Sequence, residues 1–145
     1  MVRINLIDPK YLTDQHLIAE YGEILYLLGH VRKYPKIEFM PQKYCLGAGH
    51  INFFKNKLAY LEKRFGIVKK EMQKRGFNPK LKLSLKGYPK KLKNNWNPCK
   101  DDLKIIKKRL IHKIKLKPKW YRYHKEHKSL KFYLDLTKKA KLIHS

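Results

Sequence analysis

The feature that most constrains the fold is a set of apolar stripes whose members are separated alternately by four and three residues. Such spacing places side chains on one face of an α-helix and predicts amphipathic helices. Three segments carry the pattern, and we expect helices near residues 14–33, 50–75 and 98–115. At 145 residues the chain fits one domain with a single core. We therefore expect an all-α fold, a single compact domain of three main helices with long irregular loops. The expected core positions are Leu17, Tyr21, Ile24, Leu28 and Val31, then Phe54, Leu58, Leu61, Phe65, Val68 and Met72, then Leu103, Ile106, Leu110 and Ile114.

Local signals mark where the helices begin. Thr13 or Asp14 is a suitable N-cap for the first helix, and Asn97 followed by Pro98 predicts a cap and a first turn for the third. Residues 80–86 alternate between lysine or serine and leucine, as a half-buried strand would. Because no comparable partner strand exists elsewhere, we expect an extended segment lying over the helices.

The charge of the chain points to a polyanionic partner. Its 36 lysines and arginines against 11 acidic residues give a formal net charge of +25. Nucleic acid is favoured over a membrane, because the sequence has no long apolar span and no signal-like beginning. We expect a monomeric, cytoplasmic and nucleoid-associated protein that binds double-stranded DNA. A purely structural nucleic-acid binder would carry the same charge, so charge does not separate an enzyme from a scaffold.

The cysteines and histidines do not predict a metal site. Cys45 and Cys99 are too few and too far apart for a disulfide framework or a thiolate cage, and we expect reduced thiols. His124 and His127, with Glu126 between them, come closest to a ligand pair, but no second pair completes a zinc site. We favour a solvated basic segment there and expect no metal.

The beginning of the chain offers a nucleophile. Removal of Met1, which the small second residue favours, would leave the α-amine of Val2. Such an amine has a pKa of about 8, so a useful fraction is neutral near pH 7 and can form a Schiff base. Glu23 lies on the flank of the first apolar stripe, where partial desolvation would raise its pKa and suit it to proton transfer. The alternative is an ordinary solvated glutamate.

Separated blocks of the sequence, taken in order, closely resemble the phage-type pyrimidine-dimer DNA glycosylases. Several blocks in the right order are more specific than one short motif. The resemblance covers residues 1–123 and leaves 124–145 as a basic C-terminal extension, where Leu130, Tyr133 and Leu136 predict a short helix that adds affinity for a polyanion. The blocks are Val2-Arg3-Ile4-Asn5-Leu6, Asp14-Gln15-His16-Leu17, Ala19-Glu20-Tyr21, Glu23, Val31-Arg32-Lys33, Leu46-Gly47-Ala48-Gly49-His50, Phe53-Phe54, Lys57-Leu58, Lys74-Arg75-Gly76-Phe77, Arg109-Leu110, Lys113-Ile114, Pro118 and Trp120-Tyr121.

The resemblance implies a repair activity on UV-damaged DNA. The Val2 amine would attack C1′ of the 5′ pyrimidine of a cyclobutane dimer, with Glu23 as the acidic residue at the sugar, and β-elimination would then cut the strand on the 3′ side. No cofactor is implied. The DNA-binding residues that it implies are Arg3 beside the amine, Gln15 and His16 at the pocket, Arg109 and Lys113 on phosphates, and the aromatic residues Trp120, Tyr121 and Tyr123.

Two alternatives remain open at this point. The family has arginine where this chain has Gly22 and Tyr26, and proline where it has Leu25. Those arginines contact DNA, so a glycosylase for another damaged base is one alternative, and a non-catalytic DNA-binding protein of the same fold is the other. The aromatic run at 120–123 also has two interpretations: it stacks on bases, or it packs the end of the domain against the first helix.

Overall fold

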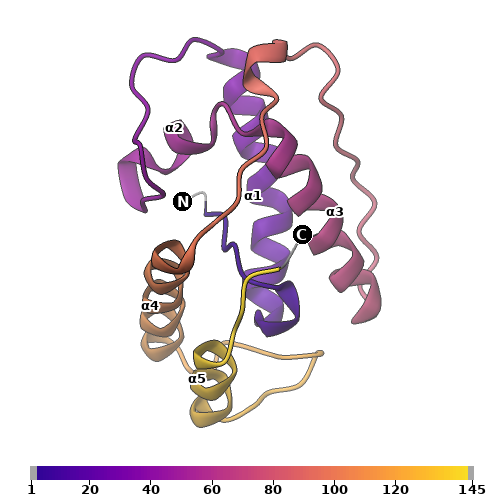
Figure 1. Ribbon diagram of the computed structural model, residues 1–145. Coiled ribbons are helices and arrows are strands. Elements are labelled where there is room, and N and C mark those ends of the chain that lie inside the picture. The colour runs from indigo at the N-terminus through magenta and orange to yellow at the C-terminus, as the bar shows by residue number, and fades with distance from the viewer. Residues whose placement is uncertain (1–2, 144–145) are drawn as a thin grey trace.

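The computed structural model describes residues 3–143 and shows an all-α fold, as the sequence predicted (Figure 1). The helices are α1 (Asp14–Lys33), α2 (His50–Phe54), α3 (Leu58–Lys74), α4 (Lys100–Leu116) and α5 (Leu130–Lys138). Within residues 3–143 the only β-type pairings are three isolated bridges. No helix in this range is both long enough and apolar enough to span a membrane.

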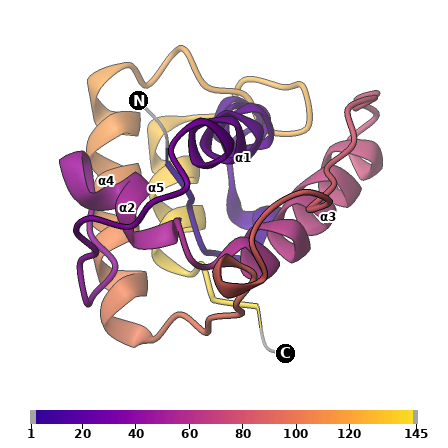
Figure 2. The ribbon, with the colours of Figure 1, turned by 90° about the horizontal axis from the view of Figure 1, so that it is seen from above.

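The core forms mainly between α1 and α3, which pack against each other. All five predicted core positions of α1 and all those of α3 are buried. The N-terminal segment, residues 3–8, runs between α3 on one side and α4 with α5 on the other (Figures 1 and 2). This segment is itself part of the core, because Ile4, Leu6 and Ile7 are buried. Residues 4–7 are thereby held in the core.

The prediction of one continuous helix over 50–75 was wrong, because residues 55–57 separate α2 from α3. Lys57 leaves helical geometry and forms a bridge with Lys93, and the Asn94 side-chain amide donates to the Asn56 carbonyl at 3.0 Å. The backbone N–H of Tyr60 also donates to the Asn94 carbonyl. The break therefore allows a distant loop to pair with the backbone.

The predicted cap of the third long helix was also wrong by two residues. The N-cap of α4 is Cys99, not Asn97, and the Cys99 backbone N–H donates to the Asp102 carboxylate at 2.8 Å. This bond between the cap and the first turn fixes the start of α4 at Lys100. The capping prediction for α1 is confirmed, because the Thr13 hydroxyl accepts from the His16 N–H.

Residues 77–85 form the extended segment that the sequence predicted. The Leu81 backbone N–H donates to the hydroxyl of Tyr21 at 2.6 Å, and Lys69 donates to the Leu81 carbonyl at 2.8 Å. Leu83 and Leu85 pack against the core, while the Leu81 side chain stays exposed. The segment therefore covers α1 and α3 without a partner strand.

The short helix predicted from Leu130, Tyr133 and Leu136 is confirmed as α5, which packs on α4. Tyr133 is fully buried and joins Ile114 and Tyr121 in a small second apolar cluster. After α5 the chain returns to the N-terminal segment, where the Asp8 N–H donates to the Lys141 carbonyl at 2.8 Å. Residues 130–141 thus brace α4 against the rest of the domain.

Candidate active site

The site is organised by a hydrogen bond between the N-terminal segment and α1. The backbone N–H of Arg3 donates to Oε2 of Glu23 at 2.8 Å. The neighbouring Ile4 is anchored on both sides, because its N–H donates to His50 Nε2 at 2.8 Å and its carbonyl accepts from the Tyr44 hydroxyl at 2.9 Å. Met1 and Val2, the predicted initiator residue and nucleophile, lie outside the described residues. The structure therefore places the Glu23 carboxyl against Arg3, the residue that follows the predicted nucleophile in the chain.

Glu23 is half-buried, and its environment favours the protonated form. Burial raises the pKa of this carboxyl from its ordinary value of 4.5 to about 7, although the hydrogen bond from the Arg3 N–H opposes the shift and Glu20 adds to it. The predicted upward shift of the Glu23 pKa is confirmed. A carboxyl that titrates near neutral pH can both donate and accept a proton at a reacting centre.

Glu20 shares one side of α1 with Glu23 but has a structural role. Its side chain is fully buried and accepts from Nε and Nη2 of Arg64 at 2.6 and 2.9 Å. Arg64 also donates to the Ile7 carbonyl at 2.6 Å, which connects α1, α3 and the N-terminal segment. Arg64 therefore satisfies the buried Glu20 carboxylate. Glu23, in contrast, faces a cavity between α1 and α4.

A small cavity of about 40 Å³ lies beside Glu23, between α1 and α4. Arg109 and Lys113 enter it from α4 and Arg3 from the N-terminal segment, so the structure brings these predicted residues together. The Nε atom of Arg109 is buried with no hydrogen-bond partner among the described residues. The cations affect one another: Arg109, followed by burial, lowers the pKa of Lys113, and burial, followed by Arg109, lowers that of Arg3. The remaining lining residues are Asn5, His16, Ala19, Glu23 and Leu110.

His16 lines this cavity as a neutral imidazole. Burial, together with the charges of Arg3, Lys113 and Arg109, lowers its pKa to about 4. Its Nδ1 lies 3.1 Å from the Thr13 hydroxyl. The protonated form is therefore scarce near neutral pH, and we assign His16 a polar lining role rather than a cationic one.

Gln15 holds the aromatic run in place. Its side-chain amide donates to the Trp120 carbonyl and accepts from the Arg122 N–H, both at 2.9 Å. The aromatic residues differ in burial. Tyr121 is buried and packs on His16 and α5, whereas Trp120 is exposed. Tyr123 is half-buried, and its hydroxyl donates to the Lys10 carbonyl at 2.7 Å. Tyr121 therefore packs the end of the domain, and Trp120 stays accessible.

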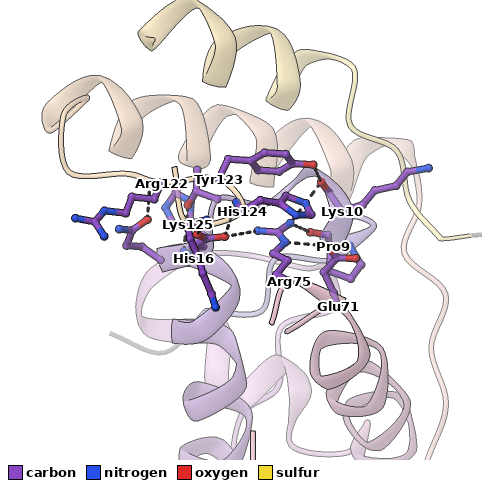
Figure 3. A network of polar contacts seen from close by, with 12 residues as sticks. Pro9, Lys10, His16, Glu71, Arg75, Arg122, Tyr123, His124 and Lys125 are labelled. Atoms are coloured by element: carbon purple, nitrogen blue, oxygen red, sulfur yellow. Dashed lines mark hydrogen bonds and ion pairs between the residues drawn. The ribbon is translucent and has the colours of Figure 1, made fainter. Parts of the chain in front are cut away.

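A polar network that the sequence did not predict positions the segment that follows α4, residues 120–125 (Figure 3). Arg75, at the end of α3, donates to Asp14 at 2.9 Å and to Glu71 at 2.8 Å. Asp14 also accepts from the backbone N–H groups of His124 and Lys125 at 3.1 and 2.7 Å. Both residues have positive φ angles, of 51° and 69°. The buried carboxylate therefore stabilises a strained turn and ties it to α1 and α3.

The described residues contain no metal-binding cluster, defined as three or more His, Cys, Asp or Glu side chains close together. Cys45 and Cys99 are both free thiols. Nδ1 of His127 lies 3.2 Å from the Tyr121 carbonyl, and its Nε2 accepts from Arg122 at 3.2 Å. His127 therefore takes part in the packing of the aromatic run.

The fold and the site define an all-α, strongly cationic domain with a half-buried carboxyl group whose pKa is raised to about 7. A family model for pyrimidine dimer DNA glycosylases matches residues 1–85, and the chain belongs to that family. This membership confirms the resemblance and supports a DNA repair glycosylase that acts on DNA. The match includes Arg3, Gln15, His16 and Glu23 and ends before α4. A family match does not test the role of a single residue. The catalytic roles of Val2 and Glu23 stay predictions, as do the DNA-binding roles of Arg3, Gln15, His16, Arg109, Lys113, Trp120, Tyr121 and Tyr123.

Proposed function

We propose that the protein is a DNA glycosylase with an associated abasic-site lyase activity, using the α-amine of Val2 as its nucleophile. The observation that carries the proposal is the 2.8 Å hydrogen bond from the Arg3 N–H to Glu23. Covalent geometry keeps the nitrogen atoms of adjacent residues within about 4 Å of each other. A processed chain that begins at Val2 would therefore have its amine close to the Glu23 carboxyl.

In the proposed first half-reaction the neutral amine attacks C1′ of the 5′ pyrimidine nucleotide of a cyclobutane dimer. A bond forms between the amine nitrogen and C1′, and the glycosidic bond breaks with its electron pair leaving on the base. Loss of a proton from the nitrogen and opening of the sugar ring then give an imine. Protonated Glu23 supplies the proton that the ring oxygen takes up as the ring opens.

In the proposed second half-reaction the imine makes the C2′ proton acidic. Ionised Glu23 accepts that proton, and β-elimination breaks the bond between C3′ and the 3′ oxygen. The released phosphate leaves with the electron pair, and the strand is cut on the 3′ side. Because burial raises the Glu23 pKa to about 7, both protonation states are populated near neutral pH. One carboxyl can therefore serve in both steps.

The cations around the cavity have a proposed role in binding the DNA backbone. Arg3, Arg109 and Lys113 face one cavity beside Glu23, and the unpartnered Nε of Arg109 suits a phosphate oxygen. A positive environment also disfavours protonation of a nearby amine, which keeps it nucleophilic. His16 is neutral there, and Gln15, the residue before it, holds the backbone of the exposed Trp120. Reaching C1′ in a duplex requires a nucleotide to leave the base stack.

Borohydride trapping tests the proposal. The mature protein is incubated with duplexes that contain an abasic site or a cyclobutane dimer, and borohydride reduces any imine to a stable protein–DNA adduct. We expect a trapped adduct with both duplexes and a large loss of strand cutting for Glu23→Gln. Glu62→Gln, which changes an exposed carboxyl on α3, is the matched control and should act like the parent. Absence of an adduct for the parent protein would refute the proposal and favour a non-catalytic binder.

The exposed Gly22 and Tyr26 favour a second candidate, a glycosylase/lyase for a different damaged base. In the resemblance these positions are DNA-contacting arginines, and neither residue here supplies a charge. Comparing strand cutting of dimer-bearing, oxidised and alkylated duplexes separates the two candidates. Faster cutting of an oxidised or alkylated duplex than of the dimer-bearing duplex would establish the second.

A further inference from the structure

The exposed side of α1 next to Glu23 carries one prominent aromatic ring. Tyr26 is 63% exposed, and it follows Glu23 by three residues, so both side chains lie on neighbouring positions of the helix surface. Ile18, the other exposed large apolar residue of α1, is 41% exposed and lies more than a turn before Glu23. A tyrosine exposed to this extent contributes little to the core, and its position beside the proposed catalytic carboxyl requires another explanation.

The helix segment that carries Tyr26 differs from the rest of the chain in its charge. Residues 11–31 contain no lysine and no arginine, although the chain has 36 of them. Phosphates are bound mainly by such cations, so this segment is poorly suited to the DNA backbone. The adjoining cavity, in contrast, contains Arg3, Arg109 and Lys113. An exposed aromatic ring on a segment without lysine or arginine, three residues from a carboxyl that lines a cationic cavity, fits a base at the ring and its phosphates at the cavity.

Glycines flank Tyr26 on the same surface of the helix, with Gly22 one turn before it and Gly29 one turn after it. A Cβ atom at either glycine would meet no atom within 4 Å, so internal packing does not require glycine there. Glycine weakens a helix interior relative to alanine. Glycine at both positions leaves the helix backbone open, so a flat partner can approach it closely while the Tyr26 ring projects beyond it.

We propose that Tyr26 stacks on a DNA base that becomes exposed when the duplex opens at the lesion, and so holds the duplex open beside Glu23. This inference rests on the proposed function. With a rise of 1.5 Å per residue, Tyr26 lies about 4.5 Å along α1 from Glu23, comparable to one base step. Tyr26 acts here as a positioning residue, with base extrusion as the step that it assists.

The test compares Tyr26→Ala and Tyr26→Phe with the parent protein. Tyr34→Ala is the matched control, because Tyr34 is also exposed but lies eleven residues beyond Glu23, about 16 Å along the helix axis. One substrate is a dimer-bearing duplex with 2-aminopurine opposite the lesion, which fluoresces more strongly when the stack opens. The other is a single strand with a ready-made abasic site, in which no base has to leave a duplex.

We expect Tyr26→Ala to slow single-turnover excision from the dimer duplex by roughly 10- to 100-fold, the range that loss of base–aromatic stacking produces. At equal DNA occupancy, the rise in 2-aminopurine fluorescence should be smaller with Tyr26→Ala than with the parent. The rate of cutting of the abasic single strand should change less than threefold. Tyr26→Phe and Tyr34→Ala should both match the parent. Circular dichroism of the variants checks that the fold is kept, as we expect for changes at exposed positions.

Two results would overturn this inference in distinguishable ways. If the parent traps an adduct while Tyr26→Ala excises at the parent rate with an unchanged 2-aminopurine signal, the stacking role is wrong and the proposed function stands. If Tyr26→Ala slows both substrates equally, Tyr26 does not act on duplex opening. Failure of the parent to trap any adduct refutes the proposed function, and the stacking role with it.

Discussion

The shifted pKa of Glu23 leads to a prediction about stability that requires no DNA. Glu23→Gln removes the titrating group and keeps an oxygen that can accept from the Arg3 N–H. In the parent, the folded protein holds a proton on Glu23 up to about pH 7, whereas the unfolded chain loses it near pH 4.5. The folded state therefore binds more protons in this window, and the free energy of unfolding falls as the pH rises from 4.5 to 7.

The size of this effect follows from the shift. Each tenfold change in proton affinity corresponds to about 1.4 kcal/mol, so a pKa change from 4.5 to about 7 would be worth roughly 3 kcal/mol at a fully buried site. Glu23 is only half-buried, and solvent screening reduces the expected value to roughly 1–2 kcal/mol. The parent should therefore lose roughly 1–2 kcal/mol of its free energy of unfolding from pH 4.5 to pH 8 that Glu23→Gln does not lose.

Urea unfolding at pH 4.5 and pH 8 measures this difference directly for the parent, Glu23→Gln and Glu62→Gln. The exposed control should show the pH dependence of the parent. Parallel pH dependences for the parent and Glu23→Gln would refute the reasoning, because they would mean that the Glu23 carboxyl titrates alike in the folded and unfolded states.

Three further predictions follow from other contacts. Arg64→Leu should lower the free energy of unfolding by roughly 3–5 kcal/mol in urea, because it leaves the Glu20 carboxylate buried without its partner. Arg109→Gln and Lys113→Gln should each reduce the slope of log affinity for duplex DNA against log salt by about 0.9, measured by fluorescence anisotropy. Gly22→Ala should raise the free energy of unfolding by about 1 kcal/mol, since its methyl group meets nothing in the fold, and should weaken DNA binding.

Each of these has a clear contrary result. A change below 1 kcal/mol for Arg64→Leu would show that the buried pair contributes little. Salt slopes equal to that of the parent would place Arg109 and Lys113 outside the DNA interface. A stabilised Gly22→Ala variant with unchanged DNA affinity would remove the argument for close approach at that position.

The parts of the fold that depend on local sequence could be predicted. The spacing of apolar residues located α1 and the inward face of α3, because a buried helical stripe repeats within one segment. The same periodicity placed Glu23 on the flank of α1, from which the direction of its pKa shift followed. The break at residues 55–57 could not be predicted, since it depends on pairing with Lys93 and Asn94 far along the chain.

The buried cations could not be predicted either. Among 36 lysines and arginines, Arg64 and Arg75 are buried in ion pairs. Apart from Glu71, four residues before Arg75, nothing in their local sequence distinguishes them. Their acidic partners Glu20 and Asp14 lie 44 and 61 residues away along the chain. Pairings at that separation depend on how α1 and α3 pack, which the periodicity of either helix does not specify.

The central claim is that the first nitrogen of the processed chain, held beside Glu23, forms the bond to the sugar. The most direct test digests the borohydride-trapped adduct with a protease and locates the attached sugar by tandem mass spectrometry. We expect a single modified peptide that begins at Val2 and carries the sugar on its α-amine. A modified lysine side chain with an unmodified Val2 amine would contradict it.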